Sequence, residues 1–304
     1  MPPALCHGLS GKALCTFDAA QAKTAWGLNH RRRFALVDGG QVLASATRYD
    51  LTGMLDQKPL TICALGSVFG VPDPAGAADH AVALVDQLLK DATRDGAELA
   101  LVFQTPETAV PLPDGFEVVP LIDAELTVAE SSRHGAPMTL VRGGEDRDIA
   151  AIAAMGRVRA ARCRFHLDRD VDLVRYALTR KRLLAGLASA GSAQLEFVIA
   201  EEGITAAAYV VISVSASTWT IEECGDRDAS GARVGALLQA LIAREPAESR
   251  PVIRGRLPPG FTPPQVTITS SPVREVLLAK VLSARVPRLN LSSADVLYWR
   301  NDMF

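Results

Sequence analysis

The sequence predicts an α/β (α+β) protein with two tandem domains, each a mixed, mostly antiparallel sheet flanked by helices. One observation is a repeated order of elements: hairpin, strand, loop, helix and strand occur twice, offset by roughly half the chain. A second is the length of 304 residues, 48% of them hydrophobic, which is enough for two separate cores.

The first copy begins with two β-type runs in residues 33–49, around the turn Asp38-Gly39-Gly40. Residues 61–69 form an apolar run that is too short for a helix, which predicts a buried strand. Apolar positions then follow helical spacing from Asp79, which is placed to cap the helix, until Gly96. The nearly continuous apolar run 98–104 predicts the next strand, covered on both faces.

The same order returns in the second half of the chain. Residues 196–212 read as a strand pair around a turn at 201–203, and residues 218–224 as the next strand. A loop, a helix from residue 232 and a short strand at 251–255 follow. We therefore expect domains at 1–130 and 138–304, joined by a linker, with residues 138–159 opening the second copy as strand, turn and helix.

Composition and charge argue against several classes of protein. A net charge of −2 gives no basic footprint for nucleic acid, so we expect no nucleic-acid partner. Five scattered cysteines without metal-ligand spacing predict a reducing compartment and no metal site. With neither a signal peptide nor a membrane span in the sequence, we expect a cytoplasmic protein that does not contact membranes. The oligomeric state is left open.

Residues 62–103, together with the hairpin before them, resemble the central motif of the GNAT acetyltransferases, and residues 138–153 with 219–243 resemble a more divergent second copy. In that family one strand lends backbone groups to the pantetheine arm of acyl-CoA, and the following loop and helix N-terminus hold the pyrophosphate. The resemblance therefore implies acetyl-CoA, or another acyl-CoA, as the cofactor. It places the pantetheine along residues 65–69, and the cofactor-binding residues that we expect are Ser67, Val68, Phe69, Gly76, Ala77, Ala78, Asp79 and His80.

The sequence departs from the family pattern at two points. The loop keeps Gly76 but has alanines where the family usually has arginines, so charge-assisted contacts to the pyrophosphate are missing. The family usually presents a tyrosine as general acid after the next strand, and residues 104–120 contain none.

Three candidates for the general base follow from the pattern and the resemblance. Glu222 and Glu223 lie on the strand from which family members present a base, and strand alternation predicts that only one of them faces a cleft. A surface pair without catalytic role is the alternative. Tandem family members use the chain's terminal carboxylate as the base, which makes Phe304 the third candidate. The alternative without a catalytic role is that the terminal segment closes the second sheet as an edge strand.

The start of the second-copy helix carries glycines and cations that could hold an anion. These residues are Arg227, Gly231, Arg233 and Gly235. A capped helix start with ordinary surface arginines is the interpretation we favour.

Two functions remain open. The first is an acyl-CoA-dependent N-acyltransferase that acetylates a primary amine of a small molecule or protein. The alternative is a non-catalytic GNAT-like module that binds a ligand or partner and has lost the cofactor loop. The alanines at the loop favour the second function, whereas Gly76 and the intact strand and helix frame favour the first.

Overall fold

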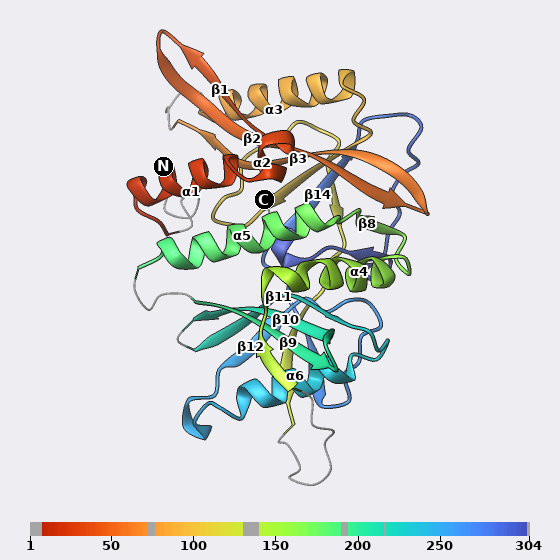
Figure 1. Cartoon of the computed structure of the whole chain (residues 1–304). Helices are drawn as coiled ribbons and strands as arrows, with labels where there is room; N and C mark the ends of the chain where they lie inside the picture. The colour runs from red at the N-terminus through yellow and green to blue at the C-terminus, as the bar shows by residue number, and fades with distance from the viewer. Residues whose placement is uncertain (1–7, 72–76, 130–139, 190–193, 216, 303–304) are drawn as a thin grey trace.

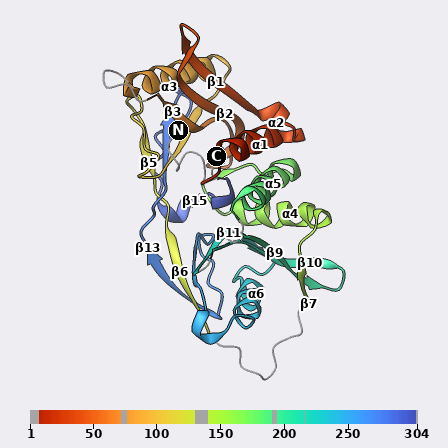
Figure 2. The same ribbon diagram turned by 90° about the vertical axis from the view of Figure 1, so that its left-hand side faces the viewer.

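The chain folds into five layers of helices and sheets, as the computed structural model shows (Figure 1). The structure describes residues 8–71, 77–129, 140–189, 194–215 and 217–302. A helix covers the outer face of each sheet, and further helices lie between the two sheets (Figure 2). The predicted fold class, two sheets flanked by helices, is confirmed.

The first sheet has the strand order β15-β8-β2-β3-β4-β14-β5, with β1 paired to β2. Its ladders are antiparallel except for β3 with β4 and β15 with β8. The strands are β1 (Arg31–Asp38), β2 (Gln41–Leu55), β3 (Lys58–Gly70), β4 (Leu99–Gln104), β5 (Glu117–Val119), β8 (Phe165–Leu167), β14 (Val276–Val281) and β15 (Val296–Leu297).

The second sheet has the order β13-β6-β12-β11-β10-β9-β7. Among its described strands, β11 and β12 alone form a parallel ladder. The strands are β6 (Asp123–Val128), β7 (Leu140–Gly143), β9 (Gln194–Glu202), β10 (Thr205–Ser215), β11 (Thr218–Asp226), β12 (Val252–Gly255) and β13 (Val266–Ser271).

The helices enclose four apolar clusters. On the outer faces, α3 (Ala77–Arg94) packs on the first sheet and α6 (Ala232–Ile242) on the second. Between the sheets lie α1 (Gly11–Ala22), α2 (Ala25–His30), α4 (Ile149–Ala160) and α5 (Val171–Leu187). Helix α5 has two apolar faces: Leu173 and Tyr176 join the core under the first sheet, and Val174 and Leu178 join the core on the second. It therefore packs against both halves of the molecule.

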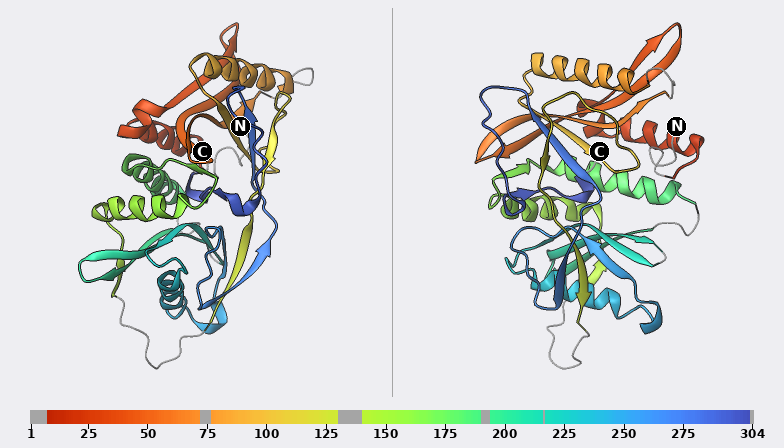
Figure 3. Two further views of the ribbon diagram at one scale, coloured as in Figure 1. Left: turned by 90° about the vertical axis from the view of Figure 1, so that its right-hand side faces the viewer. Right: turned by 180° about the vertical axis from the view of Figure 1, so that it is seen from behind.

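The two sheets exchange strands across the middle of the chain. Strand β6, which precedes the expected linker, pairs with β12 and β13 of the second sheet. Strand β14 returns from the last third of the chain to lie between β4 and β5 of the first sheet (Figure 3). Each sheet consequently depends on a segment from the other half of the sequence.

The repeated hairpins and strands occur where the sequence predicts them. The first hairpin turns at Gly39 and Gly40, both with positive φ. It continues further than predicted, because β2 runs to Leu55 and a tight turn at Asp56 and Gln57 leads directly into β3. Helix α3 begins at Ala77, so Asp79 lies inside its first turn and is not its cap, which corrects the predicted start.

Because of this exchange we expect that the first half of the chain does not fold alone. A fragment of residues 8–121 lacks β14, so both the outer edge of β4 and strand β5 lose their partner. Circular dichroism and thermal unfolding should show no cooperative transition for the fragment, whereas the full chain unfolds cooperatively. A fragment that melts cooperatively would show that β14 is dispensable for this half.

Candidate active site

Strands β3 and β4 separate at the centre of the first sheet. Their parallel ladder ends at the pair Leu65 and Val102, although β3 continues to Gly70 and β4 to Gln104. Beyond this point β3 still pairs with β2 on its other side. The backbone groups of residues 66–70 that face β4 therefore have no strand partner among the described residues, and they are available to a ligand.

A β-bulge lies on β3 just after this separation. The register between β2 and β3 shifts between Ser45 and Thr47, and Ser67 has a φ of 50°. Such a conformation is strained for a residue with a side chain, and this strain is often found at functional sites. Ser67, Val68 and Phe69, three of the expected cofactor-binding residues, therefore lie just beyond the end of the ladder between β3 and β4. The side chain of Val68 is buried in the core beneath α3.

Helix α3 follows β3 and presents its N-terminus after a short connection. It has 18 residues, which makes its N-terminal amides an effective partner for an anion. Ala77, Ala78, Asp79 and His80 form its first turn. Gly76 lies outside the described residues.

The second sheet repeats the separation of parallel strands. The ladder between β11 and β12 ends at Ile221 and Gly255, while β11 continues to Asp226. The register with β10 shifts here too, so that Glu222 is an extra residue between Ile221 and Glu223. The bulge cancels the alternation of the strand, and both glutamates point toward α5. The predicted alternation, which would place the two glutamates on opposite sides of the strand, is wrong because of this bulge.

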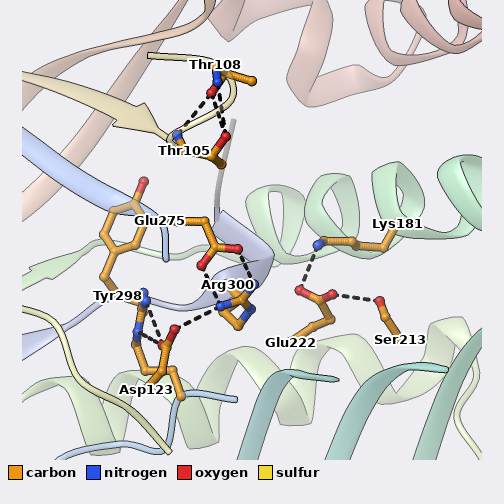
Figure 4. A network of polar contacts seen from close by, with 10 residues as sticks. Thr105, Thr108, Asp123, Lys181, Ser213, Glu222, Glu275, Tyr298 and Arg300 are labelled. Atoms are coloured by element: carbon orange, nitrogen blue, oxygen red, sulfur yellow. Dashed lines mark hydrogen bonds and ion pairs between the residues drawn. The ribbon is translucent and has the colours of Figure 1, made fainter. Parts of the chain in front are cut away.

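Glu222 accepts two hydrogen bonds inside the layer between the sheets. Lys181 Nζ of α5 lies 2.7 Å from one carboxylate oxygen, and Ser213 Oγ of β10 lies 2.6 Å from the other (Figure 4). Burial disfavours the charged carboxylate, but the Lys181 ammonium and the two hydrogen bonds outweigh it and hold the pKa of Glu222 below its ordinary value. Burial lowers the pKa of Lys181, and Glu222 opposes this.

Glu223 is held on all sides. Arg169 donates to both carboxylate oxygens at 2.8 Å, Tyr209 Oη donates at 2.6 Å and Asn301 Nδ2 at 3.0 Å. The side chain is 1% exposed. With its acceptor positions occupied, Glu223 has the contacts of a residue that positions its neighbours.

The last part of the chain docks between the two sheets. Tyr298 and Trp299 are both 2% exposed, Tyr298 in the core under the first sheet and Trp299 in the core of the second. Strand β15, which precedes them, pairs with β8 at the edge of the first sheet, so the described part of this segment does not close the second sheet. Phe304 lies outside the described residues.

Asp302 enters the same cluster as Glu223. Its Oδ1 atom lies 3.0 Å from Arg169 Nε, although the two atoms are not aligned as a hydrogen bond. Burial raises the pKa of Asp302 to about 7, the negative charge of Glu223 acts in the same direction, and Arg169 opposes them.

The N-terminus of α6 is closed by a side chain of the protein itself. The carboxylate of Asp226 accepts from the backbone amides of Arg233 and Val234 and pairs with the Arg233 guanidinium. Its side chain has no exposed surface. A methyl group on Gly235 would also lie 2.1 Å from Gln265 Oε1. The favoured interpretation, a capped helix start, agrees with this geometry, because Asp226 occupies the place of an external anion.

The structure adds residues that sequence patterns did not indicate. Lys181, Ser213, Arg169 and Asn301 come from four separate segments, and none belongs to a motif. A second network joins Asp123 to Arg256 at 2.9 Å and to Arg300 at 3.1 Å, and Arg300 also pairs with Glu275 (Figure 4). The only available signal was the mixture of charged and aromatic residues near the end of the chain.

No group of three or more potential metal ligands occurs in the described part of the chain. Among the same residues, no helix has both the length and the apolar character needed to cross a membrane.

The separated parallel strands, the bulge and the helix that follows define the fold of the GCN5-related N-acetyltransferases, and the two sheets fit a tandem arrangement of it. A probable N-acyltransferase from Enterococcus faecalis, a conserved protein of unknown function, matches 93% of this chain with a TM-score of 0.58 and 15% identity. A GCN5-related N-acetyltransferase from Anabaena variabilis matches 90% of it with a TM-score of 0.60 and 8% identity. Eis1 from Mycobacterium abscessus matches 83% with a TM-score of 0.52 and 14% identity.

This chain is shorter than the proteins it resembles. It covers 71% of the Enterococcus protein, 72% of the Anabaena protein and 64% of Eis1. No protein-family model and no curated protein matches the sequence. The similarity to these solved structures therefore establishes the fold alone.

The raised pKa of Asp302 predicts how stability depends on pH. From its ordinary value of 3.8 up to about 7, the folded state keeps a proton on Asp302 that the unfolded state has lost, so this group makes the free energy of unfolding fall as pH rises. Asp302→Asn should remove this contribution. In urea titrations the variant should gain stability relative to the natural protein between about pH 4 and 7, with no further gain above. A difference that does not change with pH would mean that Arg169 keeps Asp302 ionised throughout.

Proposed function

We propose that the protein is an acyl-CoA-dependent N-acyltransferase whose acyl donor binds the first sheet and whose amine acceptor binds between the two sheets. One contrast carries this proposal: the first copy keeps a free strand edge at residues 66–70, whereas Asp226 closes the helix N-terminus of the second. The expected domains, 1–130 and 138–304, then have different tasks. The proposal includes a cytoplasmic location, where acyl-CoA is formed.

Two backbone features of the first sheet support acyl-CoA as the donor even without strong cations. The pantetheine is an extended amide chain, and the unpaired edge of β3 offers backbone donors and acceptors to such a chain. The diphosphate fits the N-terminus of α3, where backbone amides and the helix dipole replace the missing arginines. In the proposed complex, Ser67, Val68 and Phe69 border the pantetheine, and residues Gly76, Ala77, Ala78, Asp79 and His80 surround the diphosphate.

The amine attacks the thioester directly, and two groups compete to take its proton. Glu222 is a buried carboxylate held charged beside Lys181 and Ser213, on the side of the second sheet that faces the donor. The terminal carboxylate of Phe304 follows the docked segment at Tyr298 and Trp299. In this proposal, backbone donors at residues 67–69 stabilise the developing oxyanion.

A binding module without catalysis is the second candidate. The alanines at 75, 77 and 78 support it, because they give the diphosphate no charge-assisted contact. Such a module would still be able to bind an acyl-CoA through backbone groups, and turnover separates it from an enzyme.

We expect acetyl-CoA to raise the melting temperature, because a ligand that binds only the native state stabilises it. Ala78→Glu adds a negative charge at the first turn of α3, where it favours the helix and repels a diphosphate. By calorimetry it should weaken acetyl-CoA binding about tenfold, or ~1.4 kcal/mol, with no loss of ligand-free stability.

Ser230→Glu, at the start of α6, is the matched control and should leave the affinity unchanged. If millimolar acetyl-CoA shifts neither the melting temperature nor the calorimetric signal of the natural protein, the donor site does not exist.

Glu222→Gln should lower kcat with acetyl-CoA by about 10²- to 10⁴-fold, because the amide cannot accept the proton, while acetyl-CoA affinity stays the same. Glu125→Gln, in an exposed pair with Arg254, serves as the control. Adding two glycines after Phe304 moves the terminal carboxylate and should leave kcat unchanged. The reverse pattern, in which the extension abolishes turnover and Glu222→Gln does not, would assign the proton transfer to the terminus.

A further inference from the structure

Arg180 is a buried cation for which the described residues supply no counter-ion. The residue is 6% exposed, and among the described residues its guanidinium takes part in no hydrogen bond or ion pair. Burying a charged group without a partner is costly, so such groups are rare unless a ligand completes them.

The other buried charges of this layer are paired. Arg169 pairs with Glu223, Lys181 with Glu222, and both Arg256 and Arg300 with Asp123. Arg180 is thus the exception in a region where the chain otherwise supplies a carboxylate for each cation.

The position of Arg180 follows from the two faces of α5. It lies four residues after Tyr176, on the helix face that packs under the first sheet. Its charge acts on Tyr176 and on Tyr298, whose ring stacks on Phe103 with centroids 5.8 Å apart. Phe103 is the first residue of β4 beyond the point where β4 leaves β3.

The next residue of α5 points to the other sheet. Lys181 reaches Glu222, the proposed base, while Arg180 faces the strands that hold the proposed donor. The two neighbouring side chains therefore extend from α5 toward different sheets. Burial lowers the pKa of Lys181, Glu222 opposes this, and the adjacent Arg180 charge lowers it further.

We infer that Arg180 binds a carboxylate or phosphate carried by the substrate at the point of acyl transfer. The inference rests on the proposed function and names its substrate class. The thioester end of acetyl-CoA carries no charge, so the anion belongs either to the acceptor, as in an amino acid, or to the acyl group, as in succinyl-CoA. A guanidinium recognises either group through two parallel hydrogen bonds.

Anion binding can be tested without turnover. At constant ionic strength, sodium succinate and inorganic phosphate should raise the melting temperature of the natural protein, and Arg180→Met should abolish the shift. Arg175→Met is the matched control, because Arg175 lies on the same helix, is 47% exposed and pairs with Asp172. It should keep the full shift.

Ligand-free stability separates a receptor from a structural residue. Arg180→Met removes an unpaired charge and should melt at the same temperature as the natural protein or higher. Glu223→Gln, which breaks a buried pair, should melt lower. If Arg180→Met melts as low as Glu223→Gln, Arg180 has a structural role and the inference is wrong.

Turnover identifies the source of the anion. With acetyl-CoA, a preference for L-leucine over L-leucinamide that disappears in Arg180→Met places the anion on the acceptor. With one neutral amine, a preference for succinyl-CoA over acetyl-CoA that disappears in the variant places it on the acyl group. Transfer without either preference overturns the inference and leaves the proposed function intact, whereas anion binding without any transfer supports the receptor and contradicts the function.

Discussion

The buried ion pair between Glu223 and Arg169 connects the parts of the molecule that meet at the candidate site. Glu223 belongs to the second sheet, Arg169 precedes α5, and Asn301 and Asp302 come from the end of the chain. A carboxylate in this position is stable only while all of its partners are present, since burial would otherwise favour its neutral form. The docking of the terminal segment, the position of α5 and the shape of the second sheet are therefore linked through one side chain.

The two halves use the same backbone feature for different purposes. In each, a strand leaves its parallel neighbour and carries a bulge at that point, at Ser67 in the first sheet and at Glu222 in the second. In the first the bulge leaves a free edge beside a long helix, while in the second it turns two carboxylates toward α5 and Asp226 closes the helix behind them. The same backbone feature thus gives a free strand edge in one sheet and positions two carboxylates in the other.

Local patterns predicted the repeated elements, and contacts between distant segments determined the rest. The glycine turn at residues 39–40 and the apolar spacing of α3 are properties of a few neighbouring residues, so they could be read from the sequence. The exchange of β6 and β14 depends on pairing across more than a hundred residues, which no local pattern records. The same holds for the glutamates. Their position on β11 was predicted, but their orientation depends on a bulge that only the register with β10 reveals.

The distribution of charge between the sheets bears on what such a site can select. A layer lined only by paired charges has no net charge, so it would not favour an ionic substrate over a neutral one of the same shape by charge alone. Arg180, on the face of α5 that packs under the first sheet, has no partner among the described residues, whereas Lys181 next to it is paired with Glu222. A substrate that carries both an amine and an anion would place its anion at Arg180 and present its amine toward Glu222. The asymmetry of a single helix would thus orient the acceptor, which is what direct attack on a thioester requires.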